Sequence, residues 1–509
     1  MRWLVLVTCA ACGRLGFDPT GDGGAPGPDA SFAGRHVAYL KASNPGAGDN
    51  FGNGVALDAI GDRLAIGAWL QDGGATGVNG NQNDRSQADS GAAYTFTRSG
   101  ETWAQDAYVK ASNTGTDDHF GNFVALSADG TRLAVAAPQE ASAAPGIDGN
   151  QLDDSAPGAG AAYVFDRNGA TWSQTAYIKA SNPDIDDTFG YELAISSDGN
   201  TLAIGAFFEQ SAATGIGGNQ ADNSADKAGA VYVFTFDGAW TQQVYLKASN
   251  ADAGDIFGEA VALSADGNTL AVGAPLESSA SAGIDGDQGD NSASQAGAVY
   301  VFTRSGKTWS QQAYVKASNP DQFDQFGWGV TLSADGNVLA VGARGEASDA
   351  AGLGGDQVDN SDVGAGAAYV FHRAGTQWSQ DEYVKPSNTQ PGAQFGQVVA
   401  LTPDGMRLIV DAPNEASDAT GLDGNAADTS DPGAGALYLF DHSTGTWLPG
   451  TYIKQTNTDA GDQLAWAAIT ADSATIVIGA QTEDSSAAGI DGNQADNSLT
   501  DSGAAYIYY

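Results

Sequence analysis

Alternating apolar and polar residues recur in short stretches along the chain, with Gly, Asn, Asp and Ser clustered between them. Alternation with a period of two is typical of half-buried strands. One such part of the sequence predicts four strands, at residues 257–264, 269–275, 297–304 and 308–318. Asp266-Gly267 and Ser305-Gly306 are typical of tight hairpin turns. The polar segment 276–296 predicts a long loop between the second and third strands.

The four-strand pattern repeats seven times. A phrase of the type YVKASN marks each repeat, and its tyrosines lie 68 or 69 residues apart, at Tyr39, Tyr108, Tyr177, Tyr245, Tyr314, Tyr383 and Tyr452. A Phe-Gly pair keeps the same period and becomes Leu464-Ala465 in the last repeat; it begins at Phe51, Phe120, Phe189, Phe257, Phe326 and Phe395. The repetition predicts an all-β fold, a seven-bladed β-propeller of four-stranded antiparallel blades.

The two ends of the repeat array complement each other. Residues 36–43 have the pattern of a lone fourth strand, and residues 503–509 that of a third strand with no fourth strand after it. We expect the N-terminal strand to pair with the C-terminal blade and close the ring, which removes open sheet edges. The alternative is an open solenoid, which needs terminal repeats with polar outer faces, and the sequence shows none.

Three further periodic features predict packing inside the propeller. Small residues in the second strand suit blades that approach closely near the axis; they are Gly67, Gly205, Gly273, Gly342 and Gly479. Tryptophans at the start of the fourth strand predict packing between blades; they are Trp103, Trp172, Trp240, Trp309, Trp378 and Trp447. A lysine in each YVKASN phrase predicts an ion pair or carbonyl contact within the blade, from Lys41, Lys110, Lys179, Lys247, Lys316, Lys385 and Lys454.

The charge balance narrows the range of partners. The chain has 62 acidic and 21 basic residues, for a net charge of −41. Such a surface repels phosphate backbones, so we expect no nucleic-acid partner. The charge has two explanations, a solvated acidic surface and a surface that collects cations. In either case we expect a soluble monomer.

The start of the chain has the features of an export signal. Arg2 precedes an apolar run that is too short to span a membrane. The sequence around Cys12 is similar to a bacterial lipoprotein cleavage site, which predicts a lipid on Cys12. Cys9 is the competing lipidation site, and a plain or uncleaved secretory signal is the alternative. Because the chain has only these two cysteines, residues 13–509 can form no disulfide.

These features predict three segments. Residues 1–12 form a lipoprotein-type signal peptide, and residues 13–33, rich in Gly, Pro and Asp, form a flexible linker. Residues 34–509 form the propeller. We expect an exported protein of the bacterial cell envelope, an outer-membrane lipoprotein or a cell-surface protein, that contacts the membrane only through its lipid.

The Phe-Gly pair and the phrase after the second strand resemble the FG-GAP repeats of the integrin α-subunit N-terminal β-propeller. Gly-Ala-Pro stands at residues 273–275, and variants of it stand at 136–138 and 411–413. The third-strand phrase GAVYVF, at 229–234 and 297–302, is also similar. The resemblance covers nearly all of residues 36–509. It implies a seven-bladed propeller used for extracellular binding or cell adhesion.

The calcium loops of that family have no counterpart here. In the family, loops of the type DxNxDGxxD join the first and second strands. In this chain the same connection is a turn such as Ser127-Ala128-Asp129-Gly130. This turn is too short to wrap a cation with five or more oxygens. The family's calcium sites are therefore not expected at these turns.

The loop between the second and third strands is a candidate calcium site instead. Its core, of the type GIDGNQADN, carries side-chain oxygens at positions i, i+2 and i+5, which suits a hard cation. Four repeats fill all three positions, with Asp148, Asn150 and Asp153; Asp285, Asp287 and Asp290; Asp423, Asn425 and Asp428; and Asp491, Asn493 and Asp496. The alternative is a loop whose Asx side chains satisfy its own backbone amides. These loops and the acidic links before each Phe-Gly pair should share one face of the disc, which is the expected binding surface.

The sequence shows no catalytic constellation. Its histidines occupy different repeat positions and fit no catalytic motif; they are His36, His119, His372 and His442. The clearest departures from the repeat bring no nucleophile or base; they are Trp328, Gln394, Leu464-Ala465 and Trp466. We expect a non-enzymatic envelope protein that binds an extracellular protein or glycan for adhesion or scaffolding. The alternatives are a purely structural envelope component and a glycan-active enzyme.

Overall fold

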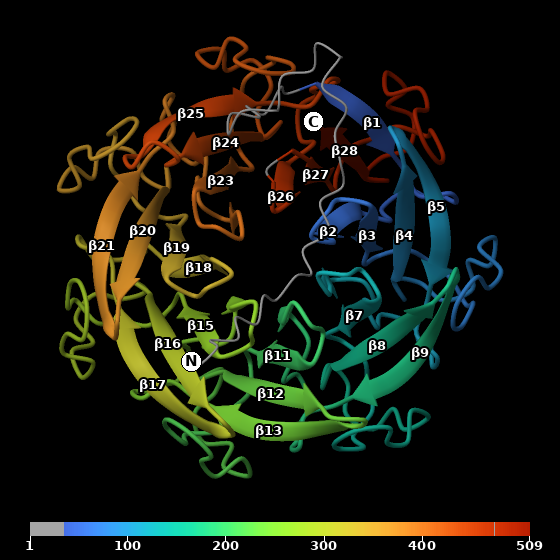
Figure 1. The fold of residues 1–509 in the computed structure, drawn as a ribbon, viewed down its shortest axis with the longest axis horizontal. Coiled ribbons are helices and arrows are strands. Elements are labelled where there is room, and N and C mark those ends of the chain that lie inside the picture. The colour runs from blue at the N-terminus through green and yellow to red at the C-terminus, as the bar shows by residue number, and fades with distance from the viewer. Residues whose placement is uncertain (1–34, 473) are drawn as a thin grey trace, which may run out of the picture.

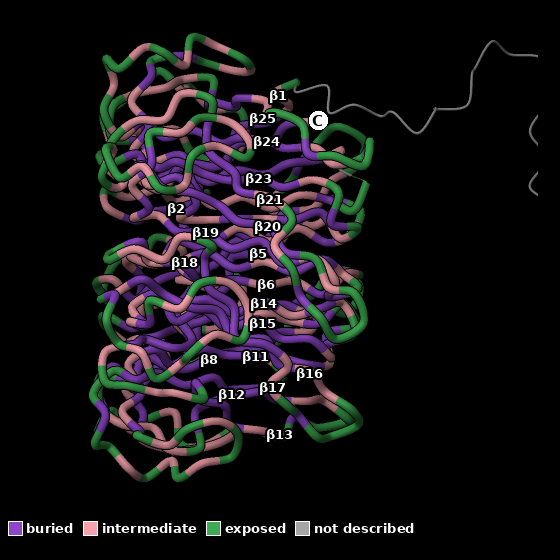
Figure 2. The backbone as a smooth tube through the Cα atoms, turned by 90° about the vertical axis from the view of Figure 1, so that its left-hand side faces the viewer, coloured by how far each residue is buried: buried purple, intermediate pink, exposed green. Residues whose placement is uncertain are grey.

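The computed structural model describes residues 35–472 and 474–509. In this part of the chain the regular elements are 28 strands, in seven four-stranded antiparallel sheets arranged around one axis (Figure 1). The predicted all-β, seven-bladed propeller is confirmed. Buried residues follow the strands through the middle of the disc, and exposed residues gather in the loops (Figure 2). The signal peptide 1–12, the linker 13–33, and Cys9 and Cys12 lie outside the described residues. The described residues contain no helix that could span a membrane.

The first strand of each blade is innermost, as β2, β18 and β26 show in Figure 1. The prediction of a strand at residues 257–264 in blade four is wrong in extent, because the strand covers only Val261–Leu263. In β2, β18 and β26 the strand does begin at the Phe-Gly pair or its Leu-Ala counterpart. The glycine of the pair, Gly258, has φ of +95°, a left-handed conformation that interrupts regular pairing. The seven inner strands are β2 (Phe51–Leu57), β6 (Val124–Leu126), β10 (Leu193–Ile195), β14 (Val261–Leu263), β18 (Phe326–Leu332), β22 (Val399–Leu401) and β26 (Leu464–Ile469).

The second strand lets neighbouring blades approach closely. A Cβ atom on Gly273 would lie 2.1 Å from the carbonyl oxygen of Gly327, which belongs to the Phe-Gly pair of the next blade. Only glycine fits at that distance, so the small residues near the axis hold blade against blade. The second strands are β3 (Arg63–Ala68), β7 (Arg132–Ala137), β11 (Thr201–Ala206), β15 (Thr269–Ala274), β19 (Val338–Ala343), β23 (Arg407–Ala412) and β27 (Ile476–Ala480).

The third strand supplies the aromatic core of the blade. Tyr300 and Phe302 meet the ring of Phe257 edge to face, with centroid distances of 5.4 and 6.2 Å. The phenylalanine of the Phe-Gly pair is thereby anchored in its own blade. The third strands are β4 (Ala92–Ser99), β8 (Ala161–Asn168), β12 (Ala230–Phe236), β16 (Ala298–Ser305), β20 (Ala367–Ala374), β24 (Ala436–Asp441) and β28 (Ala504–Tyr508).

The outer strand links five of the seven blades to the blade before, through a tryptophan hydrogen bond. Its buried tryptophan reaches across, since Trp309 Nε1 donates a hydrogen bond to Gln243 of the preceding blade at 2.8 Å. This contact confirms the predicted packing between blades. The outer strands are β5 (Thr102–Val109), β9 (Thr171–Ile178), β13 (Trp240–Leu246), β17 (Thr308–Val315), β21 (Gln377–Val384), β25 (Leu448–Ile453) and β1 (His36–Leu40).

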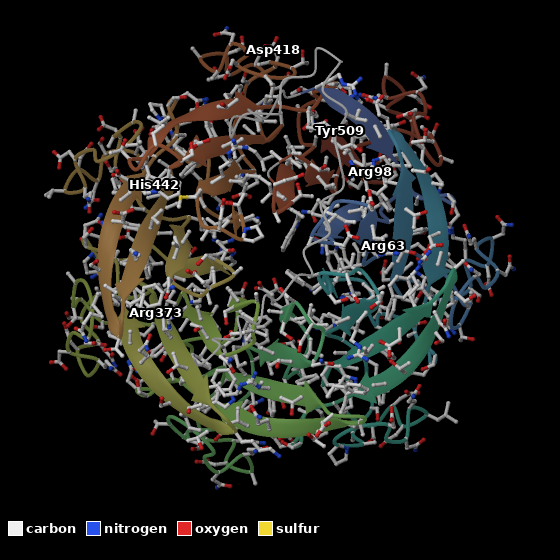
Figure 3. The ribbon with its side chains drawn as sticks, viewed as in Figure 1. Arg63, Arg98, Arg373, Asp418, His442 and Tyr509 are labelled. Carbon is white, nitrogen blue, oxygen red and sulfur yellow. The ribbon has the colours of Figure 1, made fainter. Side chains whose placement is uncertain are left out.

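The seventh blade combines both ends of the described chain. Its sheet order is β1-β28-β27-β26, and Tyr39 of β1 lies opposite Tyr506 of β28. Arg35 and Tyr509 exchange main-chain hydrogen bonds of 2.9 and 3.0 Å. The guanidinium of Arg98, in blade one, stacks over the ring of Tyr509 at 5.1 Å (Figure 3). The N-terminal strand therefore completes the last blade, and the last residue packs against the first blade.

Candidate functional site

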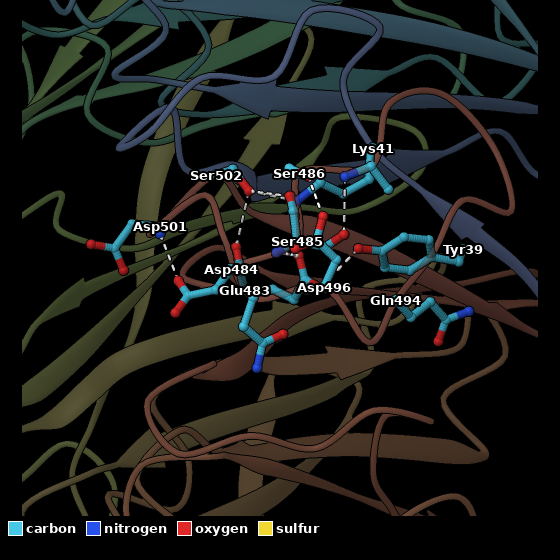
Figure 4. A network of polar contacts seen from close by, with 12 residues as sticks. Tyr39, Lys41, Glu483, Asp484, Ser485, Ser486, Gln494, Asp496, Asp501 and Ser502 are labelled. Carbon is cyan, nitrogen blue, oxygen red and sulfur yellow. Dashed lines mark hydrogen bonds and ion pairs between the residues drawn. The ribbon is translucent and has the colours of Figure 1, made fainter.

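A buried ion pair lies inside six of the seven blades. In blade four, Lys316 Nζ lies 2.9 Å from Glu277 Oε2, and the Tyr314 hydroxyl donates to the other carboxylate oxygen at 2.9 Å. Burial lowers the pKa of Lys316, against the opposing effect of Glu277. Blade seven has the same arrangement in Lys41 and Glu483 (Figure 4). The predicted contact within the blade is confirmed, and it leaves these lysines unavailable to a ligand. The other pairs are Lys179–Glu140, Lys247–Glu209, Lys385–Glu346 and Lys454–Glu415.

Blade one lacks the carboxylate of this pair. Gln71 occupies its place, and Lys110 Nζ donates to Ser90 Oγ at 2.7 Å and to the Gly91 carbonyl. Burial lowers the pKa of Lys110 to about 7. Because Lys110 is fully buried, this departure from the repeat changes the blade's interior and presents nothing to a ligand.

A buried aspartate precedes the Phe-Gly pair, or its Leu-Ala counterpart, in six blades. In blade one, Asp49 is paired with Arg85, whereas the other five aspartates form no ion pair with a described residue. Burial raises the pKa of these five, to about 7 for Asp118 and Asp255 and to about 8 for Asp187, Asp324 and Asp462. Each carboxylate accepts a hydrogen bond from the main-chain N–H three residues earlier. These aspartates fix the links that lead into the inner strands.

We expect the melting temperature to be several degrees higher at pH 5.5 than at pH 8. The five aspartates bind protons more tightly in the folded than in the unfolded state, so the stability they contribute is full below pH 4 and is lost through pH 7–8. Lys110, His36 and His119, whose pKa values burial lowers, act in the opposite direction but are fewer than the aspartates. Calorimetry across this range tests the sign, and Asp187→Asn should flatten the dependence. A melting temperature that rises steadily from pH 5.5 to pH 8 would contradict it.

The candidate calcium loops run along the outer edge of the blades. In blade two, the Asp148 N–H donates to the Tyr177 carbonyl at 2.7 Å, and the Tyr177 N–H donates to Asp148 Oδ1 at 3.0 Å. Asp285, Asp423 and Asp491 accept from a tyrosine N–H in the same way. In every blade the loop thus adds an isolated β-bridge to the outer strand and covers part of the open sheet edge.

The other candidate ligands of these loops mostly stabilise turns. Side-chain oxygens accept from the main-chain N–H two residues further on in Asn150, Asp153, Asp287, Asp290, Asp428, Asn493 and Asp496. The main-chain carbonyl of Asn425 accepts from Ser417 Oγ at 2.9 Å. Over residues 35–472 and 474–509, no three Asp, Glu, His or Cys side chains are grouped to hold a metal ion. The contacts suit the Asx-turn explanation, and calcium binding stays a prediction.

Thermal unfolding in calcium and in a chelator tests the calcium prediction. If the loops bind the ion only in the folded protein, calcium will raise the melting temperature, because such a ligand stabilises the native state. Asp285→Asn with Asp290→Asn should reduce that rise. Identical melting temperatures in calcium and chelator would leave the Asx turns as the full explanation of the loop sequence.

The candidate calcium loops, here named the rim loops, lie beside the acidic links that precede the Phe-Gly pairs, as expected. Asn291 of the blade-four loop donates to Asp252 of the link at 2.8 Å, and Asn360 donates to Asp321 at 3.0 Å in the next blade. The same hydrogen bond between the rim loop and the link thus occurs in blades four and five. These hydrogen bonds hold the loop against the acidic link in each of the two blades.

A pocket of about 530 Å³ lies on the axis, between the inner strands. The residue after each Phe-Gly pair, or its Leu-Ala counterpart, lines the pocket, and it differs along the repeats: Asn53, Asn122, Tyr191, Glu259, Trp328, Gln397 and Trp466. Trp69, Arg344 and Gln481, which follow the second strands, also line it. The pocket is thus built from positions where the repeats diverge. Trp328 and Trp466 are two of the predicted departures from the repeat, and only the closed ring places them in one pocket.

Aromatic side chains shape the walls of this axial pocket. The rings of Trp466 and Phe123, from opposite parts of the sequence, meet edge to face at 5.7 Å. The Arg344 guanidinium lies 3.0 Å from the ring centroid of Trp328 and donates from Nε to Gln325 at 2.8 Å. One indole face is therefore already occupied by a cation.

Two carboxyl groups line the same pocket. Burial raises the pKa of Glu259 to about 7, against the opposing effect of Arg344. Burial and the neighbouring Glu259 raise the pKa of Glu192 well above its ordinary value. Glu192 and Glu259 are further departures from the repeat, not among those singled out from the sequence, and they add carboxyl groups to the pocket. Comparing one repeat position across all seven repeats would have found Glu259.

The comparisons with known proteins agree with this fold. The FG-GAP repeat family matches residues 35–96, 172–234, 240–302 and 309–371. No curated protein is significantly similar in sequence. The β-propeller domain of Cps50 (Swd1) from Myceliophteria thermophila aligns at a TM-score of 0.50 and 10% identity, over 93% of this chain and 99% of that chain. At this identity the likeness shows the fold alone.

Two further solved structures are similar at lower TM-scores. A chain of a mitotic checkpoint complex aligns at a TM-score of 0.46 and 12% identity, over 91% of this chain and 94% of that chain. A Bacteroides uniformis protein described as a 6-phosphogluconolactonase aligns at 0.45 and 12% identity, over 80% and 86% of the two chains. Neither likeness bears on function. The chain contains FG-GAP repeats, four of them matched by the family, within a seven-bladed propeller.

Proposed function

We propose that the chain is a non-enzymatic binding propeller that presents its axial pocket to a protein or glycan outside the cytoplasm. One observation supports this function above the others. The framework contacts repeat from blade to blade, whereas the residues that line the pocket change. Ring closure and blade packing do not require that variety. Variable residues held on a rigid repeated scaffold are typical of binding sites.

The proposal includes display on the bacterial cell envelope. A lipid on Cys12 would anchor the chain, and the linker 13–33 would separate the propeller from the membrane. The net charge of −41 favours a soluble, monomeric propeller and disfavours nucleic acid as a partner. A purely structural envelope component remains the alternative if the pocket has no ligand.

A glycan-active enzyme is the second candidate function. Glu192 and Glu259 place two carboxyl groups with raised pKa values in one pocket, and paired carboxyls are the usual catalysts of glycoside hydrolysis. Release of reducing ends from an envelope polysaccharide, abolished by Glu259→Gln, would establish this activity. Binding without turnover would support the non-enzymatic function.

An array of glycans and surface proteins tests the proposed function with the full chain and two variants. Trp466→Ala alters the axial pocket, whereas Asp287→Lys reverses a charge on a rim loop. We expect the wild type and the rim variant to bind the same array members and the pocket variant to lose them. If the rim reversal abolishes binding and the pocket variant retains it, the site lies on the loops.

A further inference from the structure

The axial pocket contains polar groups that lack partners in the folded chain. Trp69 Nε1 is buried and has no hydrogen-bond acceptor. Within the described residues, the carboxyl of Glu259, which is 5% exposed, has neither a hydrogen bond nor an ion pair. Leaving such groups unsatisfied is costly, so the pocket needs a ligand or water that both donates and accepts hydrogen bonds.

The amide side chains of the pocket are oriented by the backbone of the neighbouring blade. Asn53 Nδ2 donates to the Asn122 carbonyl at 2.8 Å, and Asn122 Nδ2 donates to the Tyr191 carbonyl at 2.9 Å. Each bond uses one of the two N–H groups of the amide and leaves the side-chain oxygen to accept from a ligand. The arrangement fixes two acceptors around the axis.

The charges of the pocket disfavour an ionic ligand. A cation would approach the Arg344 guanidinium, which already covers the face of Trp328. An anion would approach the carboxyl of Glu259, which is partly ionised at neutral pH because its pKa is about 7. Burial favours the neutral form of Glu192, which then both donates and accepts. A neutral ligand with many hydroxyl groups avoids both repulsions and can bond to the neutral Glu192 carboxyl as donor and acceptor.

The walls complete the description of that ligand. The Trp466 and Phe123 rings and the inner-strand valines and leucines give apolar surface beside the polar groups. A pocket of about 530 Å³ is within the range that holds a small molecule. A pyranose ring has an apolar C–H face and hydroxyls at its edge, so both kinds of surface are matched.

We propose that the axial pocket binds one neutral sugar unit of a glycan, with Trp466 and Phe123 against its apolar face and Trp69, Glu259 and the asparagine oxygens bonded to its hydroxyls. The inference rests on the proposed function and names its ligand class. It assigns the site to the axis and not to the rim loops.

Titration of the folded full chain tests this inference. Neutral sugars such as glucose, galactose, N-acetylglucosamine and their disaccharides are compared with glucosamine and glucuronate by calorimetry and tryptophan fluorescence. We expect at least one neutral sugar to bind and the charged sugars to bind about tenfold or more weakly. Trp466→Ala should weaken binding about tenfold, which corresponds to about 1.4 kcal/mol. Trp69→Phe keeps the packing, removes only the donor, and should also weaken binding.

Trp378→Phe is the matched control, because Trp378 packs between outer strands and does not line the pocket. It should keep the sugar affinity of the wild type even if it lowers the melting temperature. The inference would be overturned if no neutral sugar binds the wild type. It would also be overturned if Trp69→Phe and Trp466→Ala both bind the sugar with wild-type affinity. If no neutral sugar binds but Trp466→Ala abolishes binding to a partner on the array, the proposed function stands and the sugar assignment fails.

Discussion

A chain that begins at residue 44 is expected to lose most of the stability of the propeller. The deletion removes β1, and with it the buried Tyr39 and Leu40, each of which contributes about 2–5 kcal/mol by the standard of large core residues. It also leaves Glu483 buried without Lys41, which costs about 3–5 kcal/mol. Together these losses approach the total stability of a typical domain, about 5–15 kcal/mol. The exposed edge of β28 should then cause aggregation.

Thermal unfolding and size-exclusion chromatography measure this effect. A chain that begins at residue 34 is the control and should melt at the temperature of the full chain. A synthetic peptide of residues 34–43 should restore part of the melting temperature of the truncated chain, since it supplies the missing strand. If the chain that begins at residue 44 stays monomeric with an unchanged melting temperature, β1 does not hold the ring closed.

Glu277→Gln is expected to destabilise the protein by about 3–5 kcal/mol at pH 7, because it leaves Lys316 buried without its carboxylate. The loss should shrink as the pH rises toward 10. Without Glu277 the folded-state pKa of Lys316 falls further below that of the unfolded chain, so the unfolded state binds more protons and stability rises with pH. Denaturant unfolding at pH 7 and pH 9.5 measures both effects.

Gln71→Glu is the matched reverse change. It gives blade one the carboxylate that six other blades have and should stabilise the protein, because Lys110 regains a partner. A loss below about 1 kcal/mol for Glu277→Gln, together with a loss for Gln71→Glu, would show that these pairs contribute little. The buried pairs would then be interchangeable with neutral contacts.

The regular framework could be predicted from the sequence because it repeats. A tryptophan or lysine that returns every 68 or 69 residues must occupy the same place in each blade, so Trp309 and Lys316 could be assigned to packing. The partner of the lysine could not, because Glu277 lies in the loop after the second strand and only the folded blade brings the two together. The extent of the inner strand could not be predicted either, because Gly258 and Gly327 have the same φ of +95° and only Gly327 lies within a regular strand.

The sites were harder to predict than the framework. Asp148 has the spacing of a metal ligand, and the same spacing places its carboxylate on the Tyr177 N–H, so pattern alone does not separate the two roles. The axial pocket combines one residue from each of seven repeats. Phe123 and Trp466 lie far apart in the chain and meet only because the ring closes. In the sequence, Glu259 is only one residue that varies between repeats. Its burial on the propeller axis is what identifies it as a candidate site residue.

A crystal structure of the chain with its tightest-binding neutral sugar tests the central claim most directly. The proposed site predicts electron density for the sugar in the axial pocket, against Trp466 and within hydrogen-bond distance of Glu259 and Trp69 Nε1. Density for the sugar among the rim loops, with the axial pocket holding only water at a saturating concentration, would contradict a binding site on the axis.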